Sequence, residues 1–466
     1  MEGSIVKSSA PMKLSRSSVV LAAAALAFVT RPALAQAPSA DEADAEATAP
    51  KEAAAPKEAA APKEAAAPPK EDAARAAEPA AAEQPYVGFA PPARPLRLES
   101  PDVTMQLGIL AQPQFEMAGA PDAESTSKNL FLRRMRFIVG GTLFKSFEYF
   151  FDTDYPDLFK ADPASQSGGV GKNAPGLNIQ DAFVTFKPAE NLLKADAGFM
   201  LPPFSHNGLQ GAGTLYGVDY FVNTFRRNMA NNLDPFGASG QSPAGRDLGF
   251  QLRGLVLGDH LEYRAGAFQG VRQGPLPASA GNAAVVGGNN LVRLAARVQV
   301  NVLDAEPGYF YQGTYLGTKS VLSLGAFYDI QDHYSTRGAD AFLDLPAGPG
   351  IITAQANFVQ WDGGVFVQTL PKATVVMAEA GYLIRSIMLS PSVRFENVTF
   401  ADPNASFPSE ARIGGGLAFW PYGHNSNIKA SFAHATREAR SMPTAPLTQN
   451  GHPFNQINLQ WQVYFY

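Results

Sequence analysis

The sequence predicts an all-β fold, a transmembrane antiparallel β-barrel of about 16 strands that follows a disordered Ala/Pro/Lys/Glu-rich segment. Three observations predict it. Apolar and polar residues alternate with period two over most of residues 96–466. The alternating segments are each about ten residues long, which suits a membrane-spanning strand. The joints between these segments mostly alternate between long and short along the chain.

The N-terminus predicts a signal peptide at residues 1–35. Its apolar run, Val19 to Val29, has eleven residues, which is too short for a spanning helix of about 20. Lys13 and Arg16 precede this run, and Ala33 to Ala35 supplies small residues for cleavage. Met12 is an alternative start.

Residues 36–95 have a different composition, in which the hexamer Lys-Glu-Ala-Ala-Ala-Pro begins at Lys51, Lys57 and Lys63. Proline removes a backbone donor and disfavours helical geometry in the residue before it, so a packed fold is not expected. We predict a disordered periplasmic spacer. It is either a passive linker or a tether to the cell wall.

Residues 96–466 form the predicted barrel domain, and the closing segment shows the alternation best. One face of this segment is apolar and carries Ile457, Leu459, Trp461, Val463 and Phe465. The other face is polar and carries Asn458, Gln460, Gln462 and Tyr464. A soluble β-sandwich also alternates, so the joints decide between the two folds. Predicted strands start near Val103, Phe131, Phe147, Leu177, Leu193, Asp247, His260, Leu291, Lys319, Arg337, Ile351, Thr374, Met388, Ala411, Ser426 and Asn455.

The joints alternate as a transmembrane barrel requires, because its periplasmic turns are tight and its outer loops are longer. The long joints are 115–130, 156–176, 200–246, 269–290 and 436–454. Two joints break the rule: 303–318 is long for a turn, and 331–336 is short for a loop. Aromatic residues near strand ends, among them Trp361, Trp420 and Trp461, suit interfacial girdles.

Several blocks resemble the phosphate-selective porin O/P family over residues 96–466. They are Phe131–Phe144, Ile179–Pro188, Gly198–Phe204, Gly245–Gly249 and Tyr263–Gly270. The resemblance implies a homotrimeric, 16-stranded porin in the outer membrane of a Gram-negative bacterium. It also implies a lumen lined by basic residues that conducts small anions such as phosphate.

Candidate residues for the anion pathway follow from strand parity and from the longest joint. Met135, Phe137 and Val139 take the lipid face, which places Arg134 and Arg136 on the lumen face. The full set is Arg134, Arg136, Arg226, Arg227, Arg253, Arg264, Arg293, Arg297 and Arg394. Lys187, Lys194 and Lys429 are further candidates, and joint 200–246 is expected to fold inward. Each arginine has an alternative role, which is to pair with a lumen carboxylate such as Asp181, Asp196 or Glu262.

The charge balance limits the phosphate assignment. Residues 96–466 contain 27 Lys and Arg against 30 Asp and Glu, so selectivity would depend on a local arginine cluster. We predict passive diffusion of small anions, such as phosphate or related oxyanions. The alternatives are a general, weakly selective porin and a structural tether between outer membrane and cell wall.

Other functional classes find little support in the sequence. The chain has no Cys and a net charge of -5, so Cys-ligated metals and a basic nucleic-acid surface are excluded. Its six His are dispersed, and no Gly-x-Ser-x-Gly elbow occurs. We predict neither catalysis nor a cofactor nor a metal site, and we expect outer-membrane lipid as a partner.

Overall fold

The computed structural model describes residues 95–119, 126–162, 171–172, 176–222, 245–270, 291–364, 370–401, 409–438 and 453–466. No helix in these ranges is long and apolar enough to cross a membrane. The described part of the predicted barrel domain consists almost entirely of strands.

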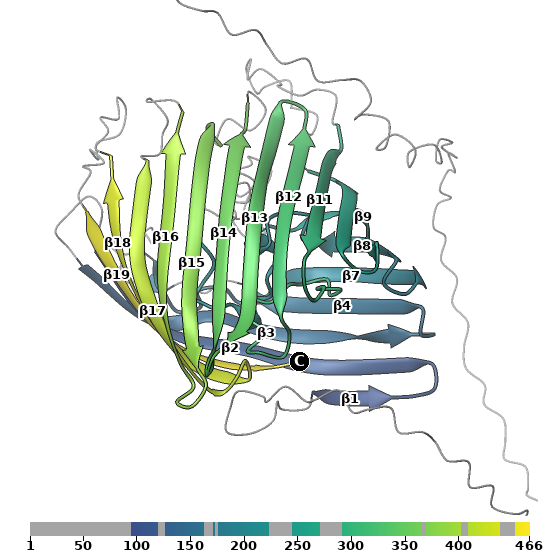
Figure 1. Cartoon of the computed structure of the whole chain (residues 1–466), viewed down its shortest axis with the longest axis horizontal. Helices are drawn as coiled ribbons and strands as arrows, with labels where there is room; N and C mark the ends of the chain where they lie inside the picture. The colour runs from purple at the N-terminus through teal and green to yellow at the C-terminus, as the bar shows by residue number, and fades with distance from the viewer. Residues whose placement is uncertain are drawn as a thin grey trace, which may run out of the picture. The chain divides into compact units, whose positions relative to one another are not determined.

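Sixteen strands form a closed antiparallel β-barrel, in which each strand pairs with its neighbours in the chain and the last strand pairs with the first. Figure 1 shows β11 to β16 side by side in chain order. The barrel strands are β2 (Val103–Gly119), β3 (Thr126–Leu143), β4 (Phe147–Asp154), β7 (Asn178–Ala189), β8 (Leu193–Met200), β9 (Asp247–Val256), β10 (Leu261–Phe268), β11 (Arg293–Asn301), β12 (Val321–Gln331), β13 (Tyr334–Ala347), β14 (Gly350–Asp362), β15 (Ala373–Ile384), β16 (Leu389–Phe400), β17 (Glu410–Tyr422), β18 (Ser426–Arg437) and β19 (Phe454–Phe465). A small separate hairpin pairs β5 (Ala161–Asp162) with β6 (Gly171–Lys172).

The period-two pattern gives the barrel an apolar outer face and a polar inner face. In β11, Leu294, Val298 and Val300 are exposed on the outside, whereas Arg293 and Arg297 are buried within the barrel. In β19, Trp461 is exposed while Gln460 and Gln462 are buried. Closure also pairs the strand edges, which hydrocarbon cannot hydrate.

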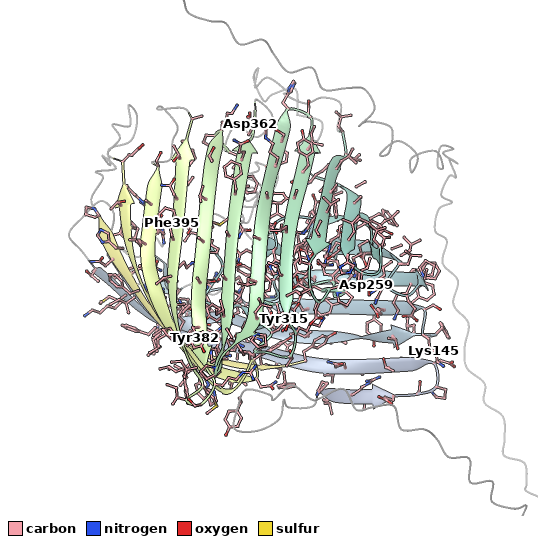
Figure 2. All side chains as sticks on the ribbon, in the orientation of Figure 1. Lys145, Asp259, Tyr315, Asp362, Tyr382 and Phe395 are labelled. Atoms are coloured by element: carbon pink, nitrogen blue, oxygen red, sulfur yellow. The ribbon has the colours of Figure 1, made fainter. Side chains whose placement is uncertain are left out.

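The two rims of the barrel differ in their joints, as the sequence predicts. Joints of two to four residues lie at one end, which we call the short-turn rim, with residues 302–320 as the exception at that end. The other end is the long-loop rim, where the exception is the two-residue joint 332–333. Both joints that break the alternation in the sequence are therefore present in the structure. Figure 2 labels Asp362 at the long-loop rim and Tyr382 toward the opposite rim.

β1 (Leu96–Glu99) is an additional strand that the alternation did not predict. It pairs with Thr104 to Leu107 of β2, while the pairing of β19 with β2 ends at Ile109. β1 therefore continues the line of β19 along the same edge of β2. The barrel wall begins at this strand and not at Val103.

Deletion of β1 tests this role. We expect a chain that lacks residues 36–95 to fold as the full mature chain does, whereas a chain that lacks residues 36–99 loses the pairing of Thr104 to Leu107 with β1. At about 1 kcal/mol for each hydrogen bond, the second deletion costs about 2–4 kcal/mol of unfolding free energy. Urea titration measures the unfolding free energy of both truncated chains, because the folded and unfolded barrels differ in electrophoretic mobility. Equal midpoints would contradict the role of β1.

Two segments from opposite rims fold into the barrel. Residues 201–222, which we call the inner loop, enter from the long-loop rim and contain two short 3-10 turns, η2 (Asn207–Leu209) and η3 (Ala212–Thr214). Residues 302–320, which we call the inner turn, enter from the short-turn rim. Their backbones meet where the Gly211 N–H donates to the Tyr311 carbonyl at 2.9 Å. Inward folding of the predicted 200–246 joint is thus confirmed for its described part.

The inner loop and the inner turn fill the barrel toward the short-turn rim. Leu209, Tyr311 and Leu316 are each at most 3% exposed. Wall residues that face them are equally buried, since Trp420, Asn427 and Gln462 are 0% exposed. This filling also explains a wrong prediction: Trp361 and Trp420 do not lie in lipid-facing girdles, because they point inward and pack in clusters that include residues of the inner loop.

Side-chain hydrogen bonds to Glu306 join the inner loop to the inner turn. His206 Nε2 lies 3.0 Å from Glu306 Oε2, and the Tyr315 hydroxyl donates to Glu306 Oε1 at 2.6 Å. Burial alone would raise the pKa of the Glu306 carboxyl, but His206 and Tyr315 outweigh it and lower that pKa. Stability from Glu306 is therefore present above its ordinary pKa of about 4.5 and is lost as the pH falls through its lower folded value.

Glu306→Ala should destabilise the barrel by about 3 kcal/mol at pH 7, because it leaves His206 and Tyr315 buried without this acceptor. Glu306→Gln keeps one acceptor oxygen and should cost about 1 kcal/mol. Urea unfolding of both variants at pH 7 measures the difference. If the two variants are equally stable, the carboxylate does not hold the segments together.

Candidate functional site

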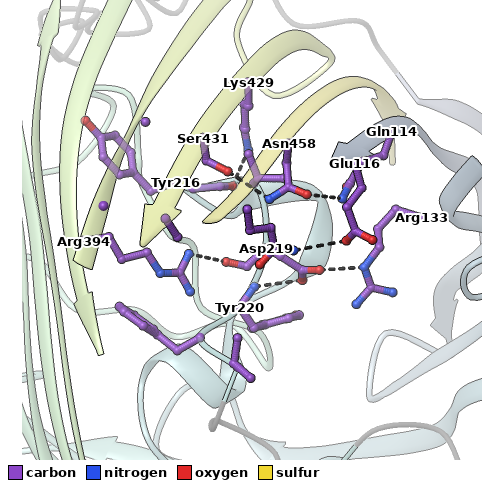
Figure 3. A pocket seen from close by; sticks show the side chains of 18 of the residues that line it. Gln114, Glu116, Arg133, Tyr216, Asp219, Tyr220, Arg394, Lys429, Ser431 and Asn458 are labelled. Carbon is purple, nitrogen blue, oxygen red and sulfur yellow. Dashed lines mark hydrogen bonds and ion pairs between the residues drawn. The ribbon is translucent and has the colours of Figure 1, made fainter. Parts of the chain in front are cut away.

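A cavity of about 770 Å³ lies inside the barrel, between the last residues of the inner loop and the wall. The wall residues come from β2, β3, β4, β7 and β15 to β19. Figure 3 shows side chains from these strands pointing toward Asp219 and Tyr220 of the inner loop. The cavity is the part of the lumen that the inner loop and the inner turn leave open.

The charged lining of the cavity is mixed and slightly positive. Among the lining residues that the structure describes, eight are basic and six are acidic, a formal net charge of +2. The basic residues are Arg133, Arg134, Arg136, Lys160, Arg246, Arg394, Arg412 and Lys429, and the acidic ones are Glu116, Asp154, Asp157, Asp219, Glu379 and Glu396. Positive charge thus predominates locally, although residues 96–466 carry a net negative charge.

A β-bulge brings two neighbouring arginines of β3 to the cavity. The β2–β3 register shifts between Ala111 and Pro113, so that Arg133 and Arg134 together face Gln112. A bulge of this kind re-aims side chains that strict alternation would send to opposite faces. Strand parity predicted Arg134 and Arg136 on the lumen face, and strict alternation would place Arg133 on the opposite face.

Asp219 of the inner loop binds both arginines. Arg133 Nε donates to Oδ2 at 2.6 Å, and Arg134 Nη2 donates to Oδ1 at 2.5 Å. Burial alone would raise the pKa of the Asp219 carboxyl, but the two guanidinium groups outweigh it and hold that pKa well below its usual range. Asp219 is therefore an anion at physiological pH and attaches the inner loop to β3.

Arg394 of β16 reaches the same residue from the other side of the cavity. Its Nη1 donates to the Asp219 carbonyl at 2.7 Å, and its guanidinium lies 3.9 Å from the centre of the Phe221 ring. Glu379 is 3.9 Å away, at the limit of an ion pair. A Cβ on Gly217 would lie 2.7 Å from Glu379 Oε1 and 3.1 Å from Arg394 Nη1, so the ends of these two side chains would have to shift for any larger residue.

Lys429 of β18 holds the inner loop through its backbone. Its Nζ donates to the Leu215 carbonyl at 2.5 Å and to the Gly217 carbonyl at 3.2 Å. The ammonium also lies 4.9 Å from the centre of the Trp420 ring. Lys429 therefore fixes the inner loop on both sides of Tyr216.

Between the charged residues of β16 to β18, the cavity wall carries small and neutral residues. Gly414 and Gly416 of β17 line the cavity, together with Ser392 and Ser431 of the neighbouring strands. Asn458 of β19 donates to the Ser431 hydroxyl at 3.2 Å. This wall leaves room for a solute and offers it hydroxyl and amide groups.

The structure divides the predicted anion-pathway residues into three groups. Arg134, Arg136 and Arg394 line the cavity. Four others do not: they are 1–6% exposed and form ion pairs within the barrel. The pairs are Arg253–Asp196, Arg264–Glu262, Arg293–Asp329 and Arg297–Asp340. Arg226 and Arg227 lie outside the described residues.

Those four arginines have the alternative role considered in the sequence analysis, which is pairing with a carboxylate. Arg264 also donates to the Tyr309 carbonyl at 2.8 Å, and Arg297 donates to the Phe204 carbonyl at 3.1 Å. Arg253 likewise donates to the Pro307 carbonyl at 3.2 Å, whereas the donors of Arg293 are taken up by Asp247 and Asp329. Arg253, Arg264, Arg293 and Arg297 are therefore left out of the pathway proposed below. The carboxylates named as alternative partners, Asp181, Asp196 and Glu262, all form ion pairs with arginine.

Several lining residues were missed by sequence reasoning. Arg133 was hidden by the bulge, and Arg412 lies at the start of β17 near the long-loop rim. Arg412 pairs with Glu410, and parity within β17 could have found it. Asp219 lies in a joint without strand periodicity, so no signal in the sequence marked it.

No known family model matches the chain, and no curated protein matches its sequence. Solved porin structures do have a similar fold. The anion-selective porin from Comamonas acidovorans has a TM-score of 0.50 at 14% sequence identity, over 78% of this chain and 100% of that chain. At this identity the likeness shows the fold alone, that of a porin barrel.

Two further solved structures are similar over the same region. The outer membrane channel DcaP of Acinetobacter baumannii has a TM-score of 0.46 at 12% identity, over 80% of this chain and 100% of that chain. OmpF of Salmonella typhi, in a complex with daunomycin, has a TM-score of 0.45 at 11% identity, over 79% of this chain and 100% of that chain.

Proposed function

We propose that the chain is an outer-membrane porin through which small anions diffuse, with phosphate or a related oxyanion as the natural solute. One observation carries the proposal: Arg133, Arg134 and Arg394 converge from two strands on one cavity inside the barrel. Guanidinium groups replace the water that an anion loses in a narrow passage. The fold shared with an anion-selective porin supports the same class.

The phosphate assignment comes from the resemblance of five sequence blocks to the phosphate-selective porin O/P family. The cavity supports it through its arginines and through the hydroxyls of Ser392 and Ser431, which suit a tetrahedral oxyanion. A second candidate, a general porin of weak selectivity, is favoured by the six carboxylates of the lining. A net charge of +2 gives a preference for anions and not an exclusion of cations.

The proposed pathway begins at Arg412 and Arg437, which both pair with Glu410 near the long-loop rim. It continues past Arg133, Arg134 and Arg394 in the cavity. Toward the short-turn rim, where the inner loop and the inner turn fill the barrel, the remaining basic candidates are Lys187 and Lys194. Lys187 pairs with Glu148 at 2.7 Å near the short-turn rim.

The remaining parts of the proposal follow from the sequence. Residues 1–35 are a signal peptide, residues 36–95 a periplasmic spacer, and residues 96–466 the porin domain of a homotrimer. A tether to the cell wall through the spacer is the structural alternative. Loss of residues 36–95 would weaken envelope attachment if the tether is real, and it would leave conduction unchanged in either case.

Phosphate titration of the chloride current tests the solute assignment. We expect millimolar phosphate to reduce the current of the refolded mature protein in a planar bilayer, because the divalent ion is held longer by the cavity arginines. Sulfate at equal ionic strength separates phosphate recognition from charge alone. A current that phosphate and sulfate leave unchanged would retire the phosphate assignment and favour the general porin.

A further inference from the structure

Asp219 fills a ring of donors that comes from the barrel wall and from its own loop. Arg133 Nε donates to Oδ2 at 2.6 Å, and Arg134 Nη2 donates to Oδ1 at 2.5 Å. The backbone N–H of Tyr220 also donates to Oδ1, at 2.8 Å. Charge-assisted donors that approach both oxygens of a planar group are the chemistry by which proteins recognise carboxylates. The chain therefore contains a carboxylate site that one of its own residues fills.

This site faces the cavity and is not sealed in the wall. The side chains of Asp219 and Arg133 are 29% and 25% exposed, whereas that of Arg134 is 4% exposed. All three line the cavity. Arg134 is thus fixed by burial and by its bond to Gln112 Oε1 at 2.9 Å, while Arg133 and the carboxylate remain within reach of a solute.

We propose that Arg133, Arg134 and the Tyr220 N–H form a binding site for small carboxylate solutes, and that Asp219 is its built-in competitor. The inference rests on the proposed anion channel, which brings the solute to the site. A singly charged, planar carboxylate matches the present occupant in charge and in shape. A phosphate dianion adds further oxygens and a second charge near Asp157, which already accepts from Arg133 at 3.1 Å.

Competition by Asp219 fits the needs of a channel. A tethered carboxylate acts at a high effective concentration, so a free carboxylate exchanges with it and is held only weakly. Weak binding at a conducting site lets the solute leave as well as enter. Removal of Asp219 should turn this weak exchange site into a vacant one with much higher affinity.

Formate titration of Asp219→Ala tests the proposal with a probe the size of the missing group. The refolded mature protein in detergent is heated at increasing formate concentration, and the apparent affinity is taken from the rise in Tm. We expect an affinity at least about tenfold higher in Asp219→Ala than in the wild type. The control is Asp102→Ala, which removes an exposed carboxylate outside the cavity, leaves the site filled, and should behave as the wild type.

Two results would overturn the proposal. One is equal formate affinity in Asp219→Ala and the wild type; the other is phosphate binding to Asp219→Ala as tightly as formate does. Should Asp219→Ala fail to fold, Asp219→Asn places a neutral amide in the site, and formate affinity between those of the wild type and a vacant site is expected. No gain over the wild type in this variant would equally overturn the proposal.

The Tm readout needs no conduction, so it separates this proposal from the proposed function. Tight formate binding by Asp219→Ala, in a protein whose pore prefers cations, would support the proposed carboxylate site and contradict the proposed anion porin. If the pore is anion-selective but Asp219→Ala binds formate no better than the wild type does, the anion porin is supported and the carboxylate site is contradicted.

Discussion

Removal of the inner turn should raise the single-channel conductance on the order of threefold, because this segment occupies lumen cross-section that the barrel wall alone would leave open. The Asp304 N–H donates to the Ser320 carbonyl at 3.0 Å, so these residues already pair as the ends of a hairpin. Residues 305–319 can therefore be replaced by Asn-Gly, which favours the two-residue turns of antiparallel hairpins.

Glu306→Gln is the control for this replacement, since it changes the contact with His206 but keeps the inner turn in place. Its conductance should equal that of the wild type. Single-channel recordings in 1 M KCl suppress charge effects and report mainly on the open area. If the variant with Asn-Gly in place of residues 305–319 folds as a barrel but conducts as the wild type, the inner turn does not restrict the pore.

Neutralisation of the arginine pair should have the second large effect, on selectivity. The double variant Arg133→Gln, Arg134→Gln removes two charges from a described lining whose formal net charge is +2, and it leaves Asp219 without its arginine partners. We expect the permeability ratio of chloride to potassium to fall at least about fivefold, since a unit charge within several ångströms of an ion in a partly buried passage contributes on the order of 1–2 kcal/mol.

The matched control is Arg337→Gln, which makes the same substitution on the outer face of the barrel. Arg337 is exposed there and donates to Gln360 Oε1 at 2.8 Å. This control should keep the selectivity of the wild type. Reversal potentials at low ionic strength give the permeability ratio for each variant. A double variant as anion-selective as Arg337→Gln would exclude Arg133 and Arg134 from the pathway.

Strand periodicity predicted the barrel well because it depends on local physics. Each residue of a strand faces either the outer surface or the lumen, so apolar and polar residues alternate in every strand. Predicted starts at Val103, Phe147, Leu193, Asp247 and Ser426 coincide with those in the structure. β1 was missed because four residues give too short a pattern to recognise.

The candidate site was only partly predictable, because it depends on contacts between distant segments. Parity placed Arg134, Arg136 and Arg394 correctly on the inner face, but it could not tell which inward arginines line open space. The inner turn, which decides this, showed in the sequence only as an unusually long joint. Asp219 and the bulge at Arg133 need the register of β2 and β3 together with the path of the inner loop.

The reversal potential of the refolded mature protein in a planar bilayer, under a tenfold KCl gradient, tests the central claim most directly. An anion-preferring pore gives a potential toward the equilibrium potential of chloride, and the account predicts this sign for the wild type. A potential toward that of potassium would contradict it, since the acidic residues of the lining would then govern conduction over Arg133, Arg134 and Arg394.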